Sequence, residues 1–302
     1  TPPAFAAPPD QPAAPEDGAE APATDESDGP GISRSMGGID TIAPEVATNR
    51  LPTVGAPAPG ETGAEAEDPV SDPRAETEEP PLRRFAAPFD APEDRPLMAV
   101  ILLDDGPGGL GPEALQGLGF PVSVAVDAQA PGARETMQAY RAQGREVLAM
   151  GALPEDARPQ DAEVALAAWF DAVPEAVALM ERGEGLLQPG REISEQLADY
   201  LADSGHGLVL FPQGLDTGVA LAGRAGVPAA TVFRDFDGAG QDARAIRRFL
   251  DNAAFRARQE GAVIMVGRLR AETLSALTFW ALQDRAESVA LAPVSSILKT
   301  VR

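Results

Sequence analysis

Short apolar runs alternate with helix-like segments along the last two thirds of the chain, and this alternation constrains the fold more than any other feature. The strand candidates are residues 98–103, 121–126, 145–150, 176–180, 207–211, 229–233, 262–267 and 288–292. Segments with apolar residues at helical spacing lie between them, at 132–143, 160–173, 190–204, 216–225, 241–260 and 271–284. Regular β-α alternation predicts a parallel sheet with crossover helices. Eight strand candidates favour a barrel or distorted barrel, so the expected fold class is α/β.

The first of these runs carries the most informative polar residues. Met98 to Leu103 is continuously apolar, which predicts a strand buried on both faces. Asp104 and Asp105 follow it directly, and the Gly-Pro-Gly-Gly after them predicts a turn. Both carboxylates are therefore expected at the carboxyl edge of the sheet. In α/β proteins that edge is where ligands bind.

The chain before residue 97 has a different composition. Residues 1–96 hold 19 of the 30 prolines and carry 20 acidic residues against 6 arginines. They lack hydrophobic periodicity, so we expect a disordered acidic Pro/Ala-rich linker over 1–96 and one folded domain over 97–302. No run of about 18 apolar residues is present, so any membrane anchor is expected upstream of this sequence.

Charge and cysteine content exclude several classes of function. The formal net charge of −23 predicts repulsion from nucleic acid and from anionic lipid surfaces. The chain has no cysteine, which removes disulfides, zinc-thiolate sites and thiol nucleophiles. Its one histidine, His206, lies between two glycines outside any motif, and we expect it to be structural or solvated.

A glycine-rich loop offers one alternative function. Residues 106–111 fit the G-x-G-x-x-G pattern of dinucleotide-binding proteins, and Asp127 follows about twenty residues later. Two carboxylates directly before the loop would repel a pyrophosphate. Pro112 also leaves too short a segment for the usual crossover helix. We therefore keep nucleotide binding only as an alternative.

Several motifs together carry a resemblance to a known family. They are VILLDDGPGG at 100–109, GREVLAM at 144–150, TVFRD at 231–235, VGRLRAETLSAL at 266–277 and APVS at 292–295. In this order and spacing, the domain from Leu97 resembles the divergent polysaccharide deacetylases, relatives of the NodB-type carbohydrate esterases. The resemblance implies a distorted (β/α) barrel of the polysaccharide-deacetylase type. It also implies a mononuclear metal site that hydrolyses N-acetyl groups of glycans, in which the metal polarises the carbonyl and a carboxylate acts as base.

The resemblance also implies ligands that this chain lacks. The family holds its metal with an Asp at the end of the first strand and two His. Met150 stands where one His is expected, and residues 178–183 read Ala-Leu-Met-Glu-Arg-Gly where an Asn-Asn-His is expected. Arg268 stands in the G-H-P-x-P-E-T-L element, and Thr231 replaces the first Asp of the D-V-F-L-D element. APVS is expected to form a closing strand.

These considerations give a set of candidate site residues. Asp104 is the candidate catalytic residue, and Asp105 is the candidate metal ligand. Asp235 and Arg268 are candidate substrate-binding residues. We expect the Arg268 guanidinium to pair with Asp104 or Asp105 and so to replace the charge of a metal. The alternatives are a solvated strand end for the Asp104–Asp105 pair, an acidic turn for Asp235 and Asp237, and a surface arginine.

The functional prediction is a polysaccharide deacetylase-like protein of the cell envelope. We expect it to be catalytically impaired and to act as a glycan- or partner-binding module. The alternatives are an active metal-dependent carbohydrate N-deacetylase with an altered site, and the nucleotide-binding protein. We expect no cofactor, and a divalent metal only if the domain is active. The expected partners are a glycan or an envelope protein. The expected location is the periplasm or envelope, anchored in the inner membrane.

Overall fold

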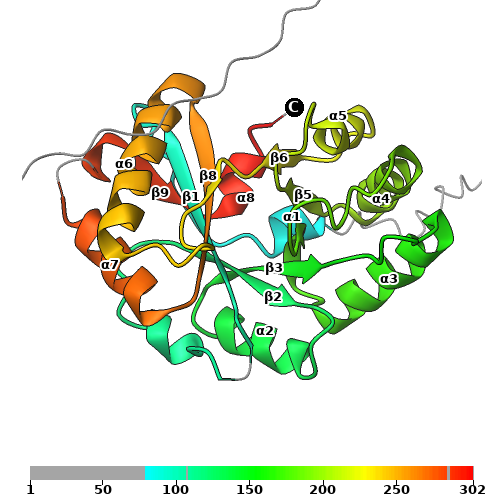
Figure 1. Ribbon diagram of the computed structural model, residues 1–302, viewed down its shortest axis with the longest axis horizontal. Coiled ribbons are helices and arrows are strands. Elements are labelled where there is room, and N and C mark those ends of the chain that lie inside the picture. Colours follow the sequence, from blue (N-terminus) through cyan, green and yellow to red (C-terminus); the bar gives the residue numbers. More distant parts are fainter. Residues whose placement is uncertain (1–78, 107, 284–285, 302) are drawn as a thin grey trace, which may run out of the picture. The chain divides into compact units, whose positions relative to one another are not determined.

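The computed structural model describes residues 79–106, 108–283 and 286–301, and these form one parallel sheet surrounded by helices (Figure 1). The strand order is β6-β5-β4-β3-β2-β1-β8-β7, and β9 also pairs with β1. The strands are β1 (Leu97–Leu103), β2 (Ser123–Asp127), β3 (Glu146–Gly151), β4 (Ala176–Glu181), β5 (Gly207–Leu210), β6 (Ala229–Thr231), β7 (Arg234–Asp235), β8 (Ala262–Arg268) and β9 (Ala290–Ala292). The expected linker over 1–78 lies outside the described residues.

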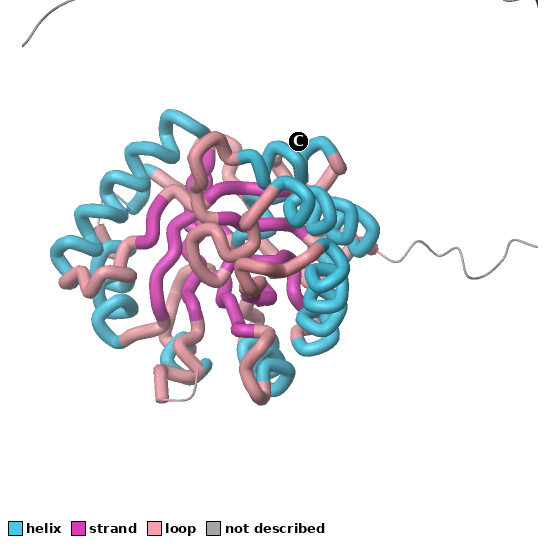
Figure 2. The backbone as a smooth tube through the Cα atoms, turned by 45° about the vertical axis from the view of Figure 1, so that its right-hand side comes forward, coloured by secondary structure: helices cyan, strands magenta, loops and turns pink. Residues whose placement is uncertain are grey.

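Helices follow most of the strands and cover the outside of the curled sheet (Figure 2). The α-helices are α1 (Pro81–Arg84), α2 (Ala133–Arg141), α3 (Pro159–Ala172), α4 (Arg191–Ser204), α5 (Thr217–Arg224), α6 (Ala243–Glu260), α7 (Ala271–Ala281) and α8 (Val294–Leu298). Two short 3-10 helices are η1 (Pro112–Leu115) and η2 (Ala286–Ser288). The predicted α/β barrel class and its eight strand candidates are confirmed.

One continuous stretch, residues 229–236, connects the two ends of the sheet. Its first half forms β6 and pairs with β5, and its second half forms β7 and pairs with β8. Val232 N donates to Leu210 O at 2.8 Å, and Phe233 N donates to Ile264 O at 2.8 Å. The sheet therefore curls round so that β5 and β8 face each other across this stretch. The sequence pattern did not indicate β7, because two polar residues carry no apolar periodicity.

Side chains alternate between two cores, as strand geometry requires. All seven residues of β1 are buried, as the apolar run predicts. Met98, Val100 and Leu102 belong to the outer core between the sheet and its helices, whereas Ala99 and Ile101 belong to the inner core. The same alternation decides where Asp104 and Asp105 point.

The amino-terminal end of the inner core is filled by elements from both ends of the domain. Val294 and Leu298 of α8 and Leu82 of α1 are buried there, with Phe85 and Phe89 packed against this core. Two expectations are thereby corrected. Residues 294–298 form a helix where a closing strand was expected, because Val294 and Ser295 give their N–H groups to side chains rather than to a strand. Residues 81–89, expected in the linker, pack because their apolar side chains close this core.

A buried carboxylate holds these elements together. Glu146, fully buried at the start of β3, accepts hydrogen bonds from Ser123 Oγ at 3.0 Å, Ser295 N at 3.0 Å and Ala87 N at 3.2 Å. Val294 N donates to Ser123 Oγ at 3.0 Å. A buried acidic group is stable only when it is hydrogen-bonded. Glu146 therefore joins β2, β3, α8 and the segment after α1.

Candidate functional site at the carboxyl edge

Asp104, the candidate catalytic residue, points to the outer layer rather than into the barrel. It continues the alternation of Val100 and Leu102, and its Oδ2 accepts a hydrogen bond of 2.7 Å from the Tyr140 hydroxyl of α2. Its Oδ1 accepts from Gly106 N at 2.7 Å. Burial raises the pKa of Tyr140, and the hydrogen bond and negative charge of Asp104 raise it further. The tyrosine therefore stays protonated and remains a donor to Asp104.

Asp105, the candidate metal ligand, lies on the exposed rim. Its Oδ2 is 3.0 Å from Arg270 Nε, two residues beyond β8. The side chains of Arg270 and Asp105 are 47% and 35% exposed, so water screens the pair. The two aspartates that follow β1 thus have different partners in different layers.

Arg268 forms the most buried ion cluster at this edge. Its Nη1 contacts Asp235 Oδ2 and lies 3.2 Å from Asp237 Oδ1, and its backbone N donates to Asp237 Oδ2 at 2.8 Å. Thr273 Oγ1 also donates to Asp237 Oδ2, at 2.6 Å. Burial lowers the pKa of Arg268, but the two aspartates raise it by more, so the guanidinium stays charged. The expected pairing of Arg268 with Asp104 or Asp105 is wrong, because Asp235 and Asp237 hold the guanidinium and Arg270 takes Asp105.

Asp235 and Asp237 form an acidic turn, one of the two alternatives that the sequence left open for them. Asp235 Oδ1 accepts from Asp237 N at 3.2 Å and Gly238 N at 2.8 Å, which is an acidic turn. Both carboxylates also bind Arg268. A Cβ on Gly238 would lie 2.3 Å from Asp235 Oδ2 and 2.7 Å from Arg268 Nη1. This close approach explains why a glycine follows Asp237.

The inner mouth of the barrel is apolar at the positions where the family has metal-binding histidines. Met150 is the last residue but one of β3 and pairs in register with Met180 of β4. Met150 is 4% exposed and Met180 is fully buried, in the same core as Phe211. Thioethers are soft ligands that suit copper(I) rather than the hard or borderline metals of hydrolases. Within the described ranges, no three His, Cys, Asp or Glu side chains are grouped to hold a metal ion. The residues present do not fit the metal that the family implies.

Two further carboxylates at this edge are also held by the chain. Fully buried Glu181 accepts from Leu187 N at 2.8 Å, Phe211 N at 2.9 Å and Gln188 Nε2 at 3.1 Å, and burial raises the pKa of Glu181. Asp127 lies 3.1 Å from Arg182 Nη2. Glu181 therefore fixes the loop after β4, and Arg182 connects the ends of β4 and β2.

The remaining sequence candidates lie away from a reacting centre. The glycine-rich loop leads into the 3-10 helix η1 rather than into an α-helix, so the helix N-terminus that holds a pyrophosphate is missing. His206 is 7% exposed at the start of β5, and its ring stacks on Phe170 with the centroids 3.8 Å apart. Burial lowers its pKa to about 4. The expectation that His206 is structural is confirmed by this packing.

Sequence reasoning missed Tyr140, Arg270 and Glu146. Arg270 lies two residues beyond the end of β8. The two-residue repeat of side chains along a strand would have placed it on the same side as Arg268. Glu146 is the Glu of the GREVLAM motif, where a charged residue opening a buried strand was a signal. Tyr140 had no such signal, because its contact with Asp104 depends on how α2 packs on β2 and β3.

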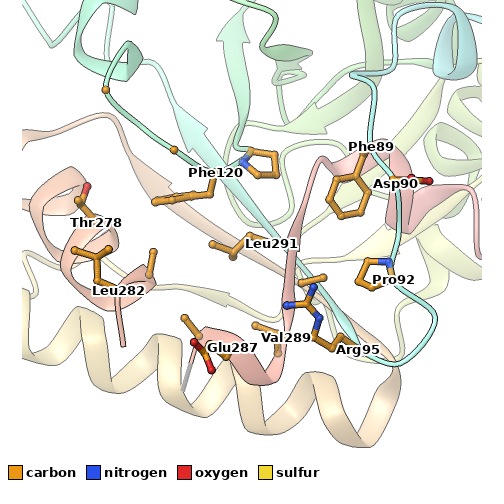
Figure 3. A pocket seen from close by; sticks show the side chains of 16 residues that line it. Phe89, Asp90, Pro92, Arg95, Phe120, Thr278, Leu282, Glu287, Val289 and Leu291 are labelled. Atoms are coloured by element: carbon orange, nitrogen blue, oxygen red, sulfur yellow. The ribbon is translucent and has the colours of Figure 1, made fainter. Parts of the chain in front are cut away.

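A pocket lies at the amino-terminal end of the sheet, opposite the carboxyl edge. It measures about 600 Å³ and is lined mainly by apolar side chains from the segment before β1, the loop before β2, α7 and β9. Figure 3 shows Leu291 between Phe120 and the segment of Phe89 and Pro92. Asp90, Arg95 and Glu287 add charges of both signs. This volume is within the range of ligand pockets.

The fold and the edge define a class of protein: a curled parallel (β/α) barrel whose polar residues gather at the carboxyl ends of its strands. The chain belongs to the divergent polysaccharide deacetylase family, whose sequence profile matches residues 101–298. The resemblance drawn from the motifs is thereby confirmed. No curated protein matches the chain.

Solved structures show the same fold. An uncharacterized protein from Agrobacterium tumefaciens C58 has a TM-score of 0.60 and 17% identity, over 72% of this chain and 95% of that one. A putative cellobiose-phosphate cleavage protein from Enterococcus faecalis V583 has a TM-score of 0.52 and 11% identity, over 67% and 99%. A putative polysaccharide deacetylase from Mycobacterium smegmatis has 15% identity over 72% and 94%, and its TM-score of 0.47 is too low to show a likeness of fold. At their low identities, the first two structures show a likeness of fold alone.

Proposed function

We propose that this protein is a non-catalytic member of the polysaccharide deacetylase family that acts at the cell envelope by binding a glycan or an envelope protein. One observation carries the proposal. Asp104, Asp105, Asp127, Glu181, Asp235 and Asp237, the carboxylates described above at the carboxyl edge, each accept a hydrogen bond or ion pair from the chain itself. A general base or metal ligand needs lone pairs directed at substrate or metal.

The buried methionines support the same proposal. A water-activating metal needs about three protein ligands and an open position. Met150 and Met180 fill the mouth with thioether side chains, and Arg268 brings a positive charge into the same edge. A guanidinium can neutralise carboxylates, but it has no open coordination position and cannot lower the pKa of a water as a metal does.

The location is part of the proposal. The family acts on polysaccharides, which supports the envelope as the working place. Among the described residues, no helix has the length and apolarity needed to span a bilayer. Anchoring in the inner membrane therefore remains an expectation, to be tested by fractionation of cells that produce the natural protein.

The test combines turnover with binding. The full chain is incubated with N-acetylated chito-oligosaccharides, with and without Zn²⁺, Mn²⁺ or Co²⁺, and acetate release is measured beside binding to the same oligosaccharides and to peptidoglycan fragments. We expect saturable binding to a glycan or envelope component and no acetate above that of a protein-free control. Acetate release that is lost in both Asp104→Asn and Asp105→Asn would contradict the proposal. It would establish the alternative, an active deacetylase with an altered site.

A further inference from the structure

A basic face runs along α6 of this acidic protein. Four exposed or half-exposed arginines of α6, with Arg234 just before it, form what we call the basic face: Arg234, Arg244, Arg247, Arg248 and Arg258. The buried side of α6 consists of Ile246, Leu250, Ala253, Ala254 and Ala257. With 3.6 residues per turn, Arg244 and Arg248 then lie on the opposite, outward side, and Arg258 lies on its flank. Figure 1 shows α6 next to α7 at the outside of the barrel.

The arginines of the basic face have no acidic partner among the residues that the structure describes. Within the described part of the chain, none of the five forms an ion pair, whereas Arg256 pairs with Glu260 on the same helix. Two acidic side chains of this segment have other roles: Asp242 caps the helix by accepting from Ala245 N at 2.7 Å, and Asp251 accepts from Trp280 Nε1 at 3.0 Å. Arg182, Arg268 and Arg270 at the carboxyl edge, in contrast, each pair with a carboxylate. The positive charge of the basic face is therefore free for a ligand.

Large apolar side chains are exposed beside these arginines. Phe255 is 55% exposed, and on α7 Phe279 is 56% exposed, with Leu282 just beyond it at 83%. The Arg247 guanidinium lies 5.0 Å from the centroid of the Phe279 ring, and the Arg258 guanidinium lies 5.5 Å from that of Phe255. Cationic and apolar groups are thus interleaved on one surface. Three of the seven large apolar side chains that the described residues expose lie here.

We infer that the basic face of α6, with Phe255, Phe279 and Leu282, binds the surface of an anionic phospholipid bilayer. Arginine forms paired hydrogen bonds with phosphate, which supplies the charge complementarity. Phenyl and leucyl groups enter the boundary between headgroups and acyl chains and are removed from water there. A polar acidic peptide would not bury these apolar side chains. Basic side chains interleaved with exposed Phe and Leu supply both the electrostatic and the apolar contribution to binding at a membrane interface.

The acidic remainder of the chain does not prevent this contact. The net charge of −23 predicts repulsion from anionic lipid, but screening limits that repulsion to about 8 Å in physiological salt. When the domain touches the bilayer, the sign of the electrostatic interaction depends on the charge of the contacting surface, and the charge of the basic face is positive. The acidic surface elsewhere orients the domain with α6 toward the bilayer. The inference does not depend on whether the domain is catalytic.

The test is vesicle flotation of the full chain. We expect it to bind vesicles of equal parts phosphatidylglycerol and phosphatidylcholine, not vesicles of phosphatidylcholine alone, and to lose binding in high salt. The variant Arg244→Glu/Arg248→Glu/Arg258→Glu should bind the anionic vesicles at least about 100-fold more weakly, at roughly a fivefold loss for each arginine replaced.

The matched control changes net charge equally on other helices. Arg158→Glu/Arg191→Glu/Arg224→Glu replaces three exposed arginines, one directly before α3, one on α4 and one on α5, and should leave vesicle binding unchanged. Circular dichroism verifies that both variants fold. Failure of the full chain to bind anionic vesicles, or equal losses in the two variants, would overturn the inference. So would binding of polyglutamate in place of vesicles, which would identify an acidic polypeptide as the partner.

Discussion

The Arg268 cluster gives the sharpest prediction on stability. Replacing Arg268 by Met keeps the length of the side chain but removes the charge that faces Asp235 and Asp237. Asp237 is only 3% exposed, and the Arg268 side chain is 20% exposed, so this is a buried pair. Removing one partner of a buried pair costs about 3–5 kcal/mol of unfolding free energy. Asp237 keeps two hydrogen bonds, from Thr273 Oγ1 and the backbone N of residue 268, so we expect a loss of about 3 kcal/mol.

The neighbouring ion pair supplies the control. Arg270→Met removes the guanidinium that contacts Asp105, where the two side chains are 47% and 35% exposed. An exposed pair contributes about 0–1 kcal/mol, so this variant should unfold almost as the unchanged protein does.

Urea unfolding, followed by tryptophan fluorescence and circular dichroism, measures the free energy of unfolding of both variants. The slopes of this free energy against urea concentration are compared to verify two-state behaviour. The double variant Arg268→Met/Asp237→Asn should recover part of the loss, because it removes the unpaired buried charge. Equal losses for Arg268→Met and Arg270→Met, or a loss under about 1 kcal/mol for Arg268→Met, would refute the reasoning.

Two further predictions concern buried residues at the amino-terminal ends of the strands, opposite the candidate site. Glu146→Ala leaves three donors without an acceptor and should lower the free energy of unfolding by about 3 kcal/mol or more. Glu146→Gln keeps one acceptor oxygen and should lower it by less. Equal decreases for the two variants, measured by urea unfolding, would contradict the role assigned to Glu146. The folded-state pKa of His206 is lowered to about 4, so its protonation favours the unfolded state as the pH falls below the unfolded value of 6.5. Relative to the His206→Phe variant, the free energy of unfolding of the unchanged protein should fall by up to about 1.4 kcal/mol per pH unit from pH 6.5 toward 4. Urea unfolding at each pH measures this difference. Parallel pH profiles for the two proteins would refute the prediction.

The fold was predictable because apolar periodicity is a local signal. The eight apolar runs and six helical segments all appear in the structure near their expected bounds. The exceptions are short or depend on distant partners. β7 is two polar residues held by β8, and α8 forms where Ser123 and Glu146 accept from its first N–H groups.

The candidate site was predictable in position but not in its contacts. The carboxyl edge was expected from the acidic pair after β1, and strand alternation could have separated Asp104 from Asp105. The partner of Arg268 could not be derived in this way. Arg268, Asp235 and Asp237 meet only because residues 229–236 cross from β5 to β8, which is a property of the closed sheet. Tyr140 likewise reaches Asp104 only through the packing of α2.

The central claim is that the carboxyl edge is satisfied by its own side chains and does not take a catalytic metal. The most direct test is the metal content of the purified full chain, as isolated and after incubation with Zn²⁺, Mn²⁺ and Co²⁺ followed by desalting. The account predicts no stoichiometric metal under any of these conditions. One bound metal per chain that disappears in Asp105→Ala would contradict it.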